Sequence, residues 1–172
     1  MEVEMKNKFV LIAICFLCFG FILFNSSQIS TVSNTRSREV VNNLIKVVSK
    51  TKAGEILLSK VNETELNLIV RKIAHAFEFF LLGIVLCFTF RYFKIDDNNL
   101  LIYTLFTVLF VAVIDEFFQI FIQNRTSSVV DVLIDFGGGI LANTLFFIFS
   151  SARGKHYKKT THMKRFVMEK NR

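Results

Sequence analysis

Ionisable side chains recur inside three of the longest apolar stretches of this sequence. A charged group inside a membrane-spanning helix costs about 2.5–3.5 kcal/mol on insertion scales, so it needs a structural or chemical reason to be there. The polar residues fall into three groups: Arg71, Lys72, His75 and Glu78; Asp115, Glu116, Gln119 and Arg125; and Asp131 and Asp135. This recurrence in separate stretches predicts one shared polar site.

The residue types in these groups are those of acid–base chemistry and anion binding. Histidine and carboxylates can transfer protons, and burial shifts their pKa values, so the candidate catalytic residues are His75, Glu78, Asp115 and Glu116. Lysine and arginine bind phosphate or carboxylate groups. The candidate substrate-binding residues are Lys72, Gln119, Arg125, Asp131 and Asp135. No serine or cysteine stands out as an activated nucleophile.

A divalent metal held by His75 and carboxylates is a variant of this prediction. Oxygen-rich ligands without a spacing typical of one metal leave its identity open, so the sequence assigns no particular cofactor. Cys15 and Cys18 have the spacing of a redox or zinc pair, but they lie inside an apolar run. We interpret them as small apolar helix residues.

Several of these polar groups also have ordinary structural explanations. Lys72 can anchor a helix at the membrane surface, His75 can be a hydrogen-bonded helix residue, and Asp131 can cap a helix. Asp115 and Asp135 lie deeper in apolar sequence and need a partner or a function. We expect Arg125 to interact with at least one carboxylate of the site, since so deep an anionic cluster needs compensation.

Four apolar runs determine the fold class: Phe9–Phe24, Ile73–Phe90, Leu100–Ile122 and Val129–Ser150. A helix needs about 20 mostly apolar residues to cross the hydrocarbon, and continuous runs of this kind form helices rather than alternating strands. Hydrophobic residues make up 52% of the chain, with 21 Phe and no Pro or Trp. The prediction is an all-α, polytopic membrane bundle of about four transmembrane helices.

The order of these spans brings the polar groups to one side of the membrane. The polar residues lie at the N-terminal end of the second span, the C-terminal end of the third and the N-terminal end of the fourth. Those three ends lie on the same side of the membrane. At a rise of 1.5 Å per residue, Glu78, Glu116 and Asp135 lie about 7–10 Å inside the hydrocarbon edge. We predict one cavity containing His75, Glu78, Glu116 and Asp135, with Lys72 and Arg125 at its mouth. The three glycines at 137–139 predict close helix packing instead of a phosphate loop.

The segments outside the spans carry most of the remaining polar residues. Val40 to Val48 place apolar residues on one helical stripe and predict a short amphipathic helix ending near Gly54, in the first extracytoplasmic loop. Asn62 with Glu65 predicts a helix N-cap and its partner. We therefore expect a membrane domain over residues 1–150 and a basic cytoplasmic tail over 151–172.

Basic residues give the expected orientation. Twelve Lys or Arg residues lie on the side of the two termini and nine on the other, which favours both termini in the cytoplasm. The net charge of +7 fits residues that orient helices and touch anionic lipid, and it does not indicate nucleic-acid binding. The first run, preceded by Lys6 and Lys8, is expected to be a retained anchor, although a cleaved signal peptide is the alternative.

The spacing of the polar residues closely resembles that of the VanZ-like family. The first matching segment is Lys-x-x-His-x-x-Glu-Phe, which begins at Lys72, and the second is Asp-Glu-x-x-Gln, which begins at Asp115. The third consists of Arg125, a spacer of five residues, and Asp-x-x-x-Asp-x-x-Gly, which begins at Asp131. The resemblance covers about residues 9–150 and includes Ser26-Ser27-Gln28 after the first run. Asp135 departs from the family's pattern, which often has Asn there. The resemblance implies a bacterial plasma-membrane protein of the cell envelope, associated with resistance to the glycopeptide teicoplanin.

Three functions remain open at this stage. The first is an outward-facing site that binds or modifies an anionic envelope headgroup, with membrane lipids or a lipid-linked wall precursor as partners. The second is a non-enzymatic scaffold, held by a buried ion network, that binds a lipid or a protein partner. The third is a small proton-coupled carrier, for which four spans are few. The oligomeric state is not predicted.

Overall fold

The computed structural model describes residues 2–28, 30–50, 62–123, 125 and 127–170. Over these residues the backbone forms five helices and no strand. The helices are α1 (Glu2–Ser26), α2 (Ser30–Val48), α4 (Glu63–Tyr92), α5 (Asp97–Gln119) and α6 (Val129–Lys170). The predicted all-α class is confirmed.

Four of the described helices are long and apolar enough to cross a membrane. Their candidate spans are Glu4–Ser26, Glu63–Tyr92, Asp97–Gln119 and Val129–Ser151, with mean hydropathies of 2.5, 2.0, 2.1 and 1.8. Large apolar side chains cover the outer surfaces of these helices, as expected where lipid and not water is the solvent. The prediction of about four membrane helices is therefore confirmed.

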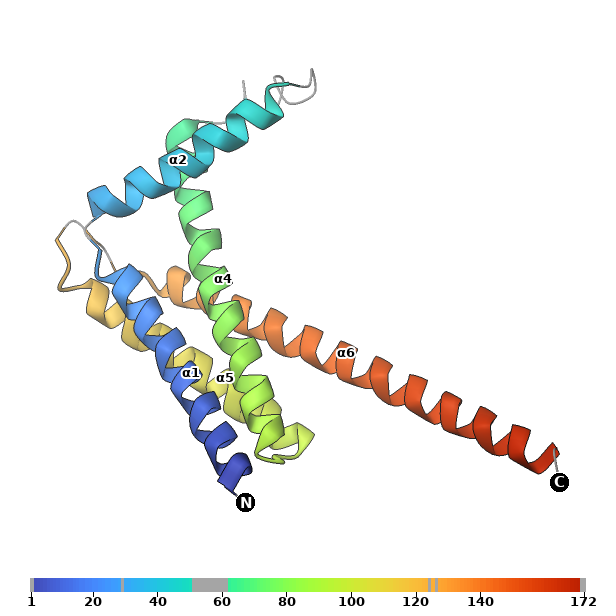
Figure 1. Cartoon of the computed structure of the whole chain (residues 1–172). Coiled ribbons are helices and arrows are strands. Elements are labelled where there is room, and N and C mark those ends of the chain that lie inside the picture. The colour runs from blue at the N-terminus through green and yellow to red at the C-terminus, as the bar shows by residue number, and fades with distance from the viewer. Residues whose placement is uncertain (1, 29, 51–61, 124, 126, 171–172) are drawn as a thin grey trace.

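Helix α4 is the central element of the bundle, because it packs against each of the other four helices. Figure 1 shows α1, α4 and α5 running alongside one another, while α6 crosses them and extends beyond the bundle toward the C-terminus. The amphipathic helix α2 lies across one end of α4 (Figure 1). The polar ends of α4, α5 and α6 meet near that same end.

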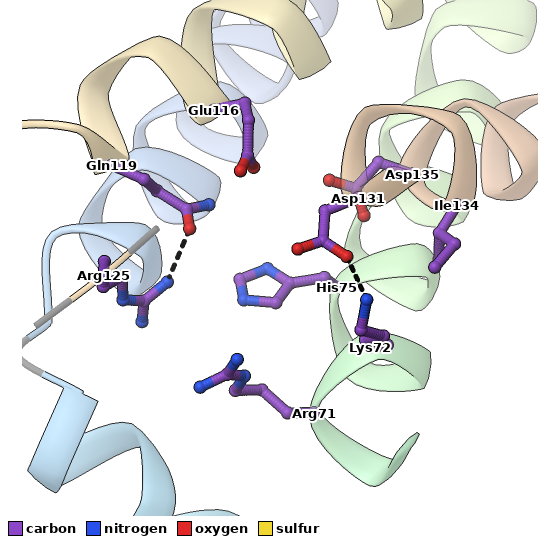
Figure 2. Close-up of a pocket in the computed structure, with 9 residues that line it drawn as sticks. All are labelled: Arg71, Lys72, His75, Glu116, Gln119, Arg125, Asp131, Ile134 and Asp135. Atoms are coloured by element: carbon purple, nitrogen blue, oxygen red, sulfur yellow. Dashed lines mark hydrogen bonds and ion pairs between the residues drawn. The ribbon is translucent and has the colours of Figure 1, made fainter. Parts of the chain in front are cut away.

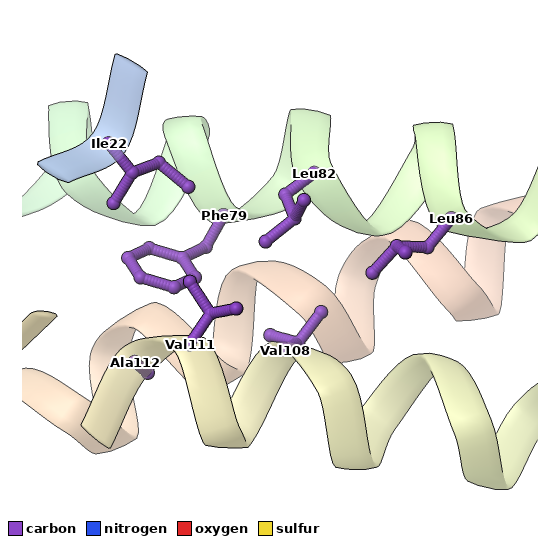
Figure 3. Close-up of a cluster of buried hydrophobic side chains, with 7 residues drawn as sticks. All are labelled: Ile22, Phe79, Leu82, Leu86, Val108, Val111 and Ala112. Atoms are coloured by element: carbon purple, nitrogen blue, oxygen red, sulfur yellow. The ribbon is translucent and has the colours of Figure 1, made fainter. Parts of the chain in front are cut away.

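The core is a layer of apolar side chains between α1, α4 and α5 (Figure 3). Phe79 and Val108 are fully buried at its centre, and Ile22 of α1 closes it. Against this layer α6 approaches α4 closely, since a Cβ atom on Gly138 would lie 2.1 Å from the backbone oxygen of Ala76. Gly138 and Gly139 thus form the close-packing surface that the sequence predicts, whereas Gly137 does not contribute to it, because an added Cβ atom there would meet nothing within 4 Å.

The turn between α4 and α5 is fixed by capping at both helix ends. Lys94 adopts a left-handed conformation (φ 61°), and the Ile95 amide donates to the Phe90 carbonyl at 3.1 Å, which terminates α4 in a Schellman motif. Asp96 then caps α5 by accepting from the Asn99 amide at 3.1 Å. This backbone hydrogen bond lowers the pKa of the exposed Asp96 carboxyl.

Several helix boundaries differ from those predicted. The third apolar run extends to Ile122, but α5 ends at Gln119, because the amides of the next residues bond to carbonyls only three positions back. Helix α2 begins at Ser30, well before the predicted stripe, and Gly54 lies outside the described residues. The predicted cap at Asn62 is present, with its side chain accepting from the Thr64 amide at 3.0 Å.

Candidate functional site

A polar cavity of about 80 Å³ lies where the ends of α4, α5 and α6 meet. Figure 2 shows its walls, with Arg71 and His75 of α4 and Arg125 of the segment between α5 and α6 pointing into the same space. The lining residues are Arg71, Lys72, His75, Glu116, Gln119, Arg125, Asp131, Ile134 and Asp135. Segments more than 40 positions apart in the chain therefore contribute to one cavity.

All of the sequence-predicted site residues except Glu78 and Asp115 line this cavity. Glu78 lies one helical turn beyond His75 and lines an adjoining cavity instead. Asp115 is completely buried behind the cavity wall, where it bonds to other side chains. The structure thus assembles the predicted residues at one end of the bundle but divides them among three environments.

Lys72 of α4 and Asp131 of α6 form an ion pair across one wall of the cavity (Figure 2). About a third of each side chain is exposed, at 37% and 30%, so water screens part of their attraction. Asp131 lies in the first turn of α6, where the helix dipole also favours a negative charge. The pair connects α4 to α6 and leaves the Lys72 cation at the edge of the cavity.

A buried chain of hydrogen bonds connects α1 to Arg125. Ser26 donates to Asp115 at 2.7 Å, and Gln119 donates to the same carboxylate oxygen at 2.9 Å. Arg125 in turn donates to the Gln119 carbonyl oxygen at 3.2 Å. The Gln119 amide thus donates through its nitrogen and accepts through its oxygen, and these two hydrogen bonds fix its orientation.

The expected interaction of Arg125 with a carboxylate of the site is electrostatic, because Asp115 and Glu116 both favour the charged guanidinium. The hydrogen-bond partner of Arg125 is the Gln119 side chain, and Asp131 pairs with Lys72. Desolvation, and then the nearby Arg71 cation, lower the pKa of the Arg125 guanidinium. Its Nε and Nη2 atoms are buried and have no hydrogen-bond partner among the described residues.

The His75–Glu78 pair lies between the cavity and the end of α1. His75 Nδ1 is 3.7 Å from one Glu78 oxygen, a spacing set by their positions one turn apart on α4. The other Glu78 oxygen accepts from the Asn25 amide at 2.8 Å. Both side chains are mostly buried, at 17% and 15% exposure. Asn25 thus orients the carboxylate toward the imidazole.

Glu116 and Asp135 form the deeper acidic wall. Glu116 accepts from the Ser128 backbone amide at 2.5 Å, immediately before α6 begins. Its second oxygen is buried without a hydrogen-bond partner among the residues that the structure describes. Asp135 is 3% exposed and faces the cavity one turn beyond Asp131. The cavity therefore has cations toward its rim and carboxylates at its base.

The donor set gives no specific support to a metal centre. Among the described residues, no group of three or more His, Cys, Asp or Glu side chains is placed to hold a metal ion. The carboxylates are instead divided between protein donors: Asp115 bonds to Ser26, Glu116 to a backbone amide and Asp131 to Lys72. The expectation of a divalent metal thus stays a prediction.

Two residues join the polar cluster that the sequence analysis did not assign to it, because Asn25 and Ser26 bond to Glu78 and Asp115. Their signals in the sequence were the polar stretch directly after the first apolar run, on the same side of the membrane as the site, and, for Ser26, the family resemblance. Arg71, which the sequence groups with Lys72 and His75, lines the cavity.

Fold and site together define a multi-pass membrane protein with a polar cavity between the ends of its helices. The model of the VanZ/LLP1 family matches residues 9–150, which is most of the chain. The chain therefore belongs to the VanZ/LLP1 family, as the resemblance of its polar motifs predicts. No curated protein and no solved structure matches it.

Proposed function

We propose that the polar cavity binds the anionic headgroup of a cell-envelope lipid. The observation that carries this proposal is Arg125, whose side chain lines the cavity and whose Nε and Nη2 atoms are buried without a hydrogen-bond partner among the described residues. Arg71 and Lys72 face the same space, so an anion would meet several cations there. Arginine's planar donors match phosphate and carboxylate oxygens, and burial strengthens such bonds.

The carboxylates of the cavity are compatible with a bound anion, because two of them already interact with a positively charged or hydrogen-bond-donating group of the protein. Asp131 is paired with Lys72, and Glu116 accepts from the Ser128 amide. Asp135 lines the base of the cavity, and the second Glu116 oxygen has no hydrogen-bond partner among the described residues, so these carboxylates would accept a hydrogen bond from a hydroxyl or amine of the same headgroup. A headgroup with an anionic group and a nearby donor fits this arrangement.

The acid–base roles proposed for the site belong to His75 and its neighbours. His75 lies between Glu78 and the carboxylates of the cavity, so it can receive a proton from one side and deliver it to the other. Glu116 and the buried Asp115 are the remaining candidates. Any modification of the bound headgroup would use this group, with Arg125 holding the anion.

The test is anion binding by the purified protein in detergent micelles that contain phosphatidylglycerol. We expect Arg125→Gln to weaken binding about tenfold or more, the cost of about 1.4 kcal/mol for one charged bond. Arg91→Gln is the matched control, because Arg91 pairs with Asp97 at the opposite end of α4. Equal binding by all three proteins would contradict the proposal.

The buried ion network supports a second candidate function, that of a non-enzymatic scaffold. Its supporting observation is the Ser26–Asp115–Gln119 chain, which connects α1 and α5 through two residues, Ser26 and Asp115, that do not line the cavity. Glu116→Gln separates the two candidates because it keeps the shape of the side chain. A folded variant that loses the cellular phenotype favours chemistry, and a variant that keeps it favours the scaffold.

We further propose that the cavity faces the cell exterior from a bacterial plasma membrane, with both termini in the cytoplasm. The supporting evidence is the distribution of basic residues. Cysteine labelling of intact cells at positions 59 and 159 tests the orientation: reaction at 59 alone is expected, and reaction at 159 alone reverses it. Expression in a teicoplanin-susceptible strain, with and without Arg125→Gln, tests the proposed link to antibiotic resistance.

A further inference from the structure

A second cavity of about 240 Å³ adjoins the polar one beneath α2. The end of α1 and the middle parts of α2 and α4 form its walls, and Arg71 and His75 line both cavities. The two cavities therefore adjoin at these two side chains. The lining residues of the second cavity are Asn25, Gln28, Ser37, Val40, Val70, Arg71, Ala74, His75 and Glu78.

The chemistry of this cavity differs from that of its neighbour. Aliphatic side chains from α2 and α4 form much of its wall, including Val40 and Val70. Its polar members are the amides and hydroxyl of Asn25, Gln28 and Ser37, together with Glu78 and the shared side chains of Arg71 and His75. One Glu78 oxygen is buried without a hydrogen-bond partner among the described residues. Away from the two shared side chains and Glu78, the wall is uncharged and suits a group that has both apolar surface and a few oxygen atoms.

We propose that the two cavities form one binding site for a lipid, in which the second cavity holds the glycerol-ester segment next to the headgroup. This inference rests on the proposed function, because it takes the polar cavity as the position of the anionic group. The polar cavity holds only a few water molecules' worth of volume, so it accommodates one phosphate-sized group. The neighbouring part of the ligand must then lie outside it.

The second cavity adjoins the proposed headgroup position at Arg71 and His75. Helix α2 covers it from the polar side of the bundle, and the end of the α1 span forms another wall. Ligand atoms following the anionic group would pass Arg71 and His75 and meet Val70 and Ala74 of α4. The acyl chains would then leave along the exposed apolar faces of the helices. A soluble phosphate has no group that would use this space.

The experiment fills the second cavity and compares a lipid with soluble phosphate. Val70→Trp places a large ring into the cavity, whereas the matched control Ile69→Trp changes the preceding residue, whose side chain is 51% exposed and does not line the cavity. Purified protein is titrated with short-chain phosphatidylglycerol and, separately, with inorganic phosphate, which has no glycerol segment. We expect Val70→Trp to weaken phosphatidylglycerol binding about tenfold and to leave inorganic phosphate binding unchanged.

Three outcomes overturn this inference or separate it from the proposed function. Unchanged phosphatidylglycerol binding by Val70→Trp contradicts the second cavity's role while the proposed function stands. Binding of inorganic phosphate by the unaltered protein that is as tight as phosphatidylglycerol binding also contradicts it. If the unaltered protein binds neither ligand, the proposed function itself fails. Ala74→Phe, with Ile73→Phe as its control, repeats the test should Val70→Trp not fold.

Discussion

Replacing Gly138 by alanine is expected to separate α6 from α4. The added Cβ atom would lie 2.1 Å from the Ala76 oxygen and 3.0 Å from the Ala76 carbonyl carbon. Both atoms belong to backbone, so no side-chain rotation relieves the overlap, and one helix must move. Overpacking of this kind typically costs about 1–3 kcal/mol. The move would also separate His75 of α4 from Asp135 of α6, which face each other across the cavity.

Gly137 provides an adjacent control for this change. An added Cβ atom there meets no other atom within 4 Å. Alanine favours a helix over glycine by about 0.5–1 kcal/mol, so Gly137→Ala should be neutral or mildly stabilising. The same propensity gain offsets part of the overlap at Gly138, which leaves an expected difference between the two variants of about 1–3 kcal/mol.

Thermal unfolding of the detergent-solubilised proteins measures this difference, and titration with phosphatidylglycerol measures its effect on the site. Gly138→Ala should unfold at a lower temperature than both Gly137→Ala and the unaltered protein, and should bind the lipid more weakly. If Gly138→Ala is at least as stable as Gly137→Ala, the close approach of α4 and α6 is not a property of the folded protein.

Two further changes test the hydrogen bonds and charges of the site. Ser26→Ala removes a bond to the buried Asp115 carboxylate and should destabilise the protein by about 1.5–3 kcal/mol in thermal unfolding. Ser27→Ala is the control, because Ser27 is exposed and its hydroxyl donates to a backbone carbonyl one turn back. If the two variants lower the unfolding temperature equally, the buried hydrogen bond does not contribute measurably to stability. Asp131→Asn removes the partner of Lys72, so phosphate should bind up to about fivefold more tightly, corresponding to about 1 kcal/mol for a part-exposed pair. Weaker phosphate binding by this variant would show that Lys72 needs its partner to be positioned.

The membrane helices could be predicted because their signal is long and local. Each apolar run is long enough to cross the hydrocarbon and so indicates by itself that the helix is surrounded by lipid. The cap at Asn62 and the assembly of polar helix ends followed from equally simple rules of spacing and connectivity. Helix ends were less predictable, since Ile120 to Ile122 are apolar and yet form turns beyond α5.

The internal geometry of the site could not be obtained from the sequence. Whether Arg71 lies in the cavity or at the lipid surface depends on the rotation of α4, which packing against the other helices decides. The hydrogen-bond partner of Arg125 depends on the course of a loop that no sequence periodicity encodes. That partner is the Gln119 amide, whereas the sequence had suggested a carboxylate. The contribution of Asn25 and Ser26 required knowing that α1 lies against α4 and α5.

The bonds from α1 to the buried carboxylates have a consequence for the biogenesis of the protein. Chains are synthesised from the N-terminus, so Asn25 and Ser26 reach the membrane before Glu78 and Asp115. Each acidic side chain costs about 2.5–3.5 kcal/mol to insert alone, yet its hydrogen-bond donor is already present when it arrives. We therefore expect the end of the first helix to form its hydrogen bonds with α4 and then with α5 as each of these helices enters the membrane.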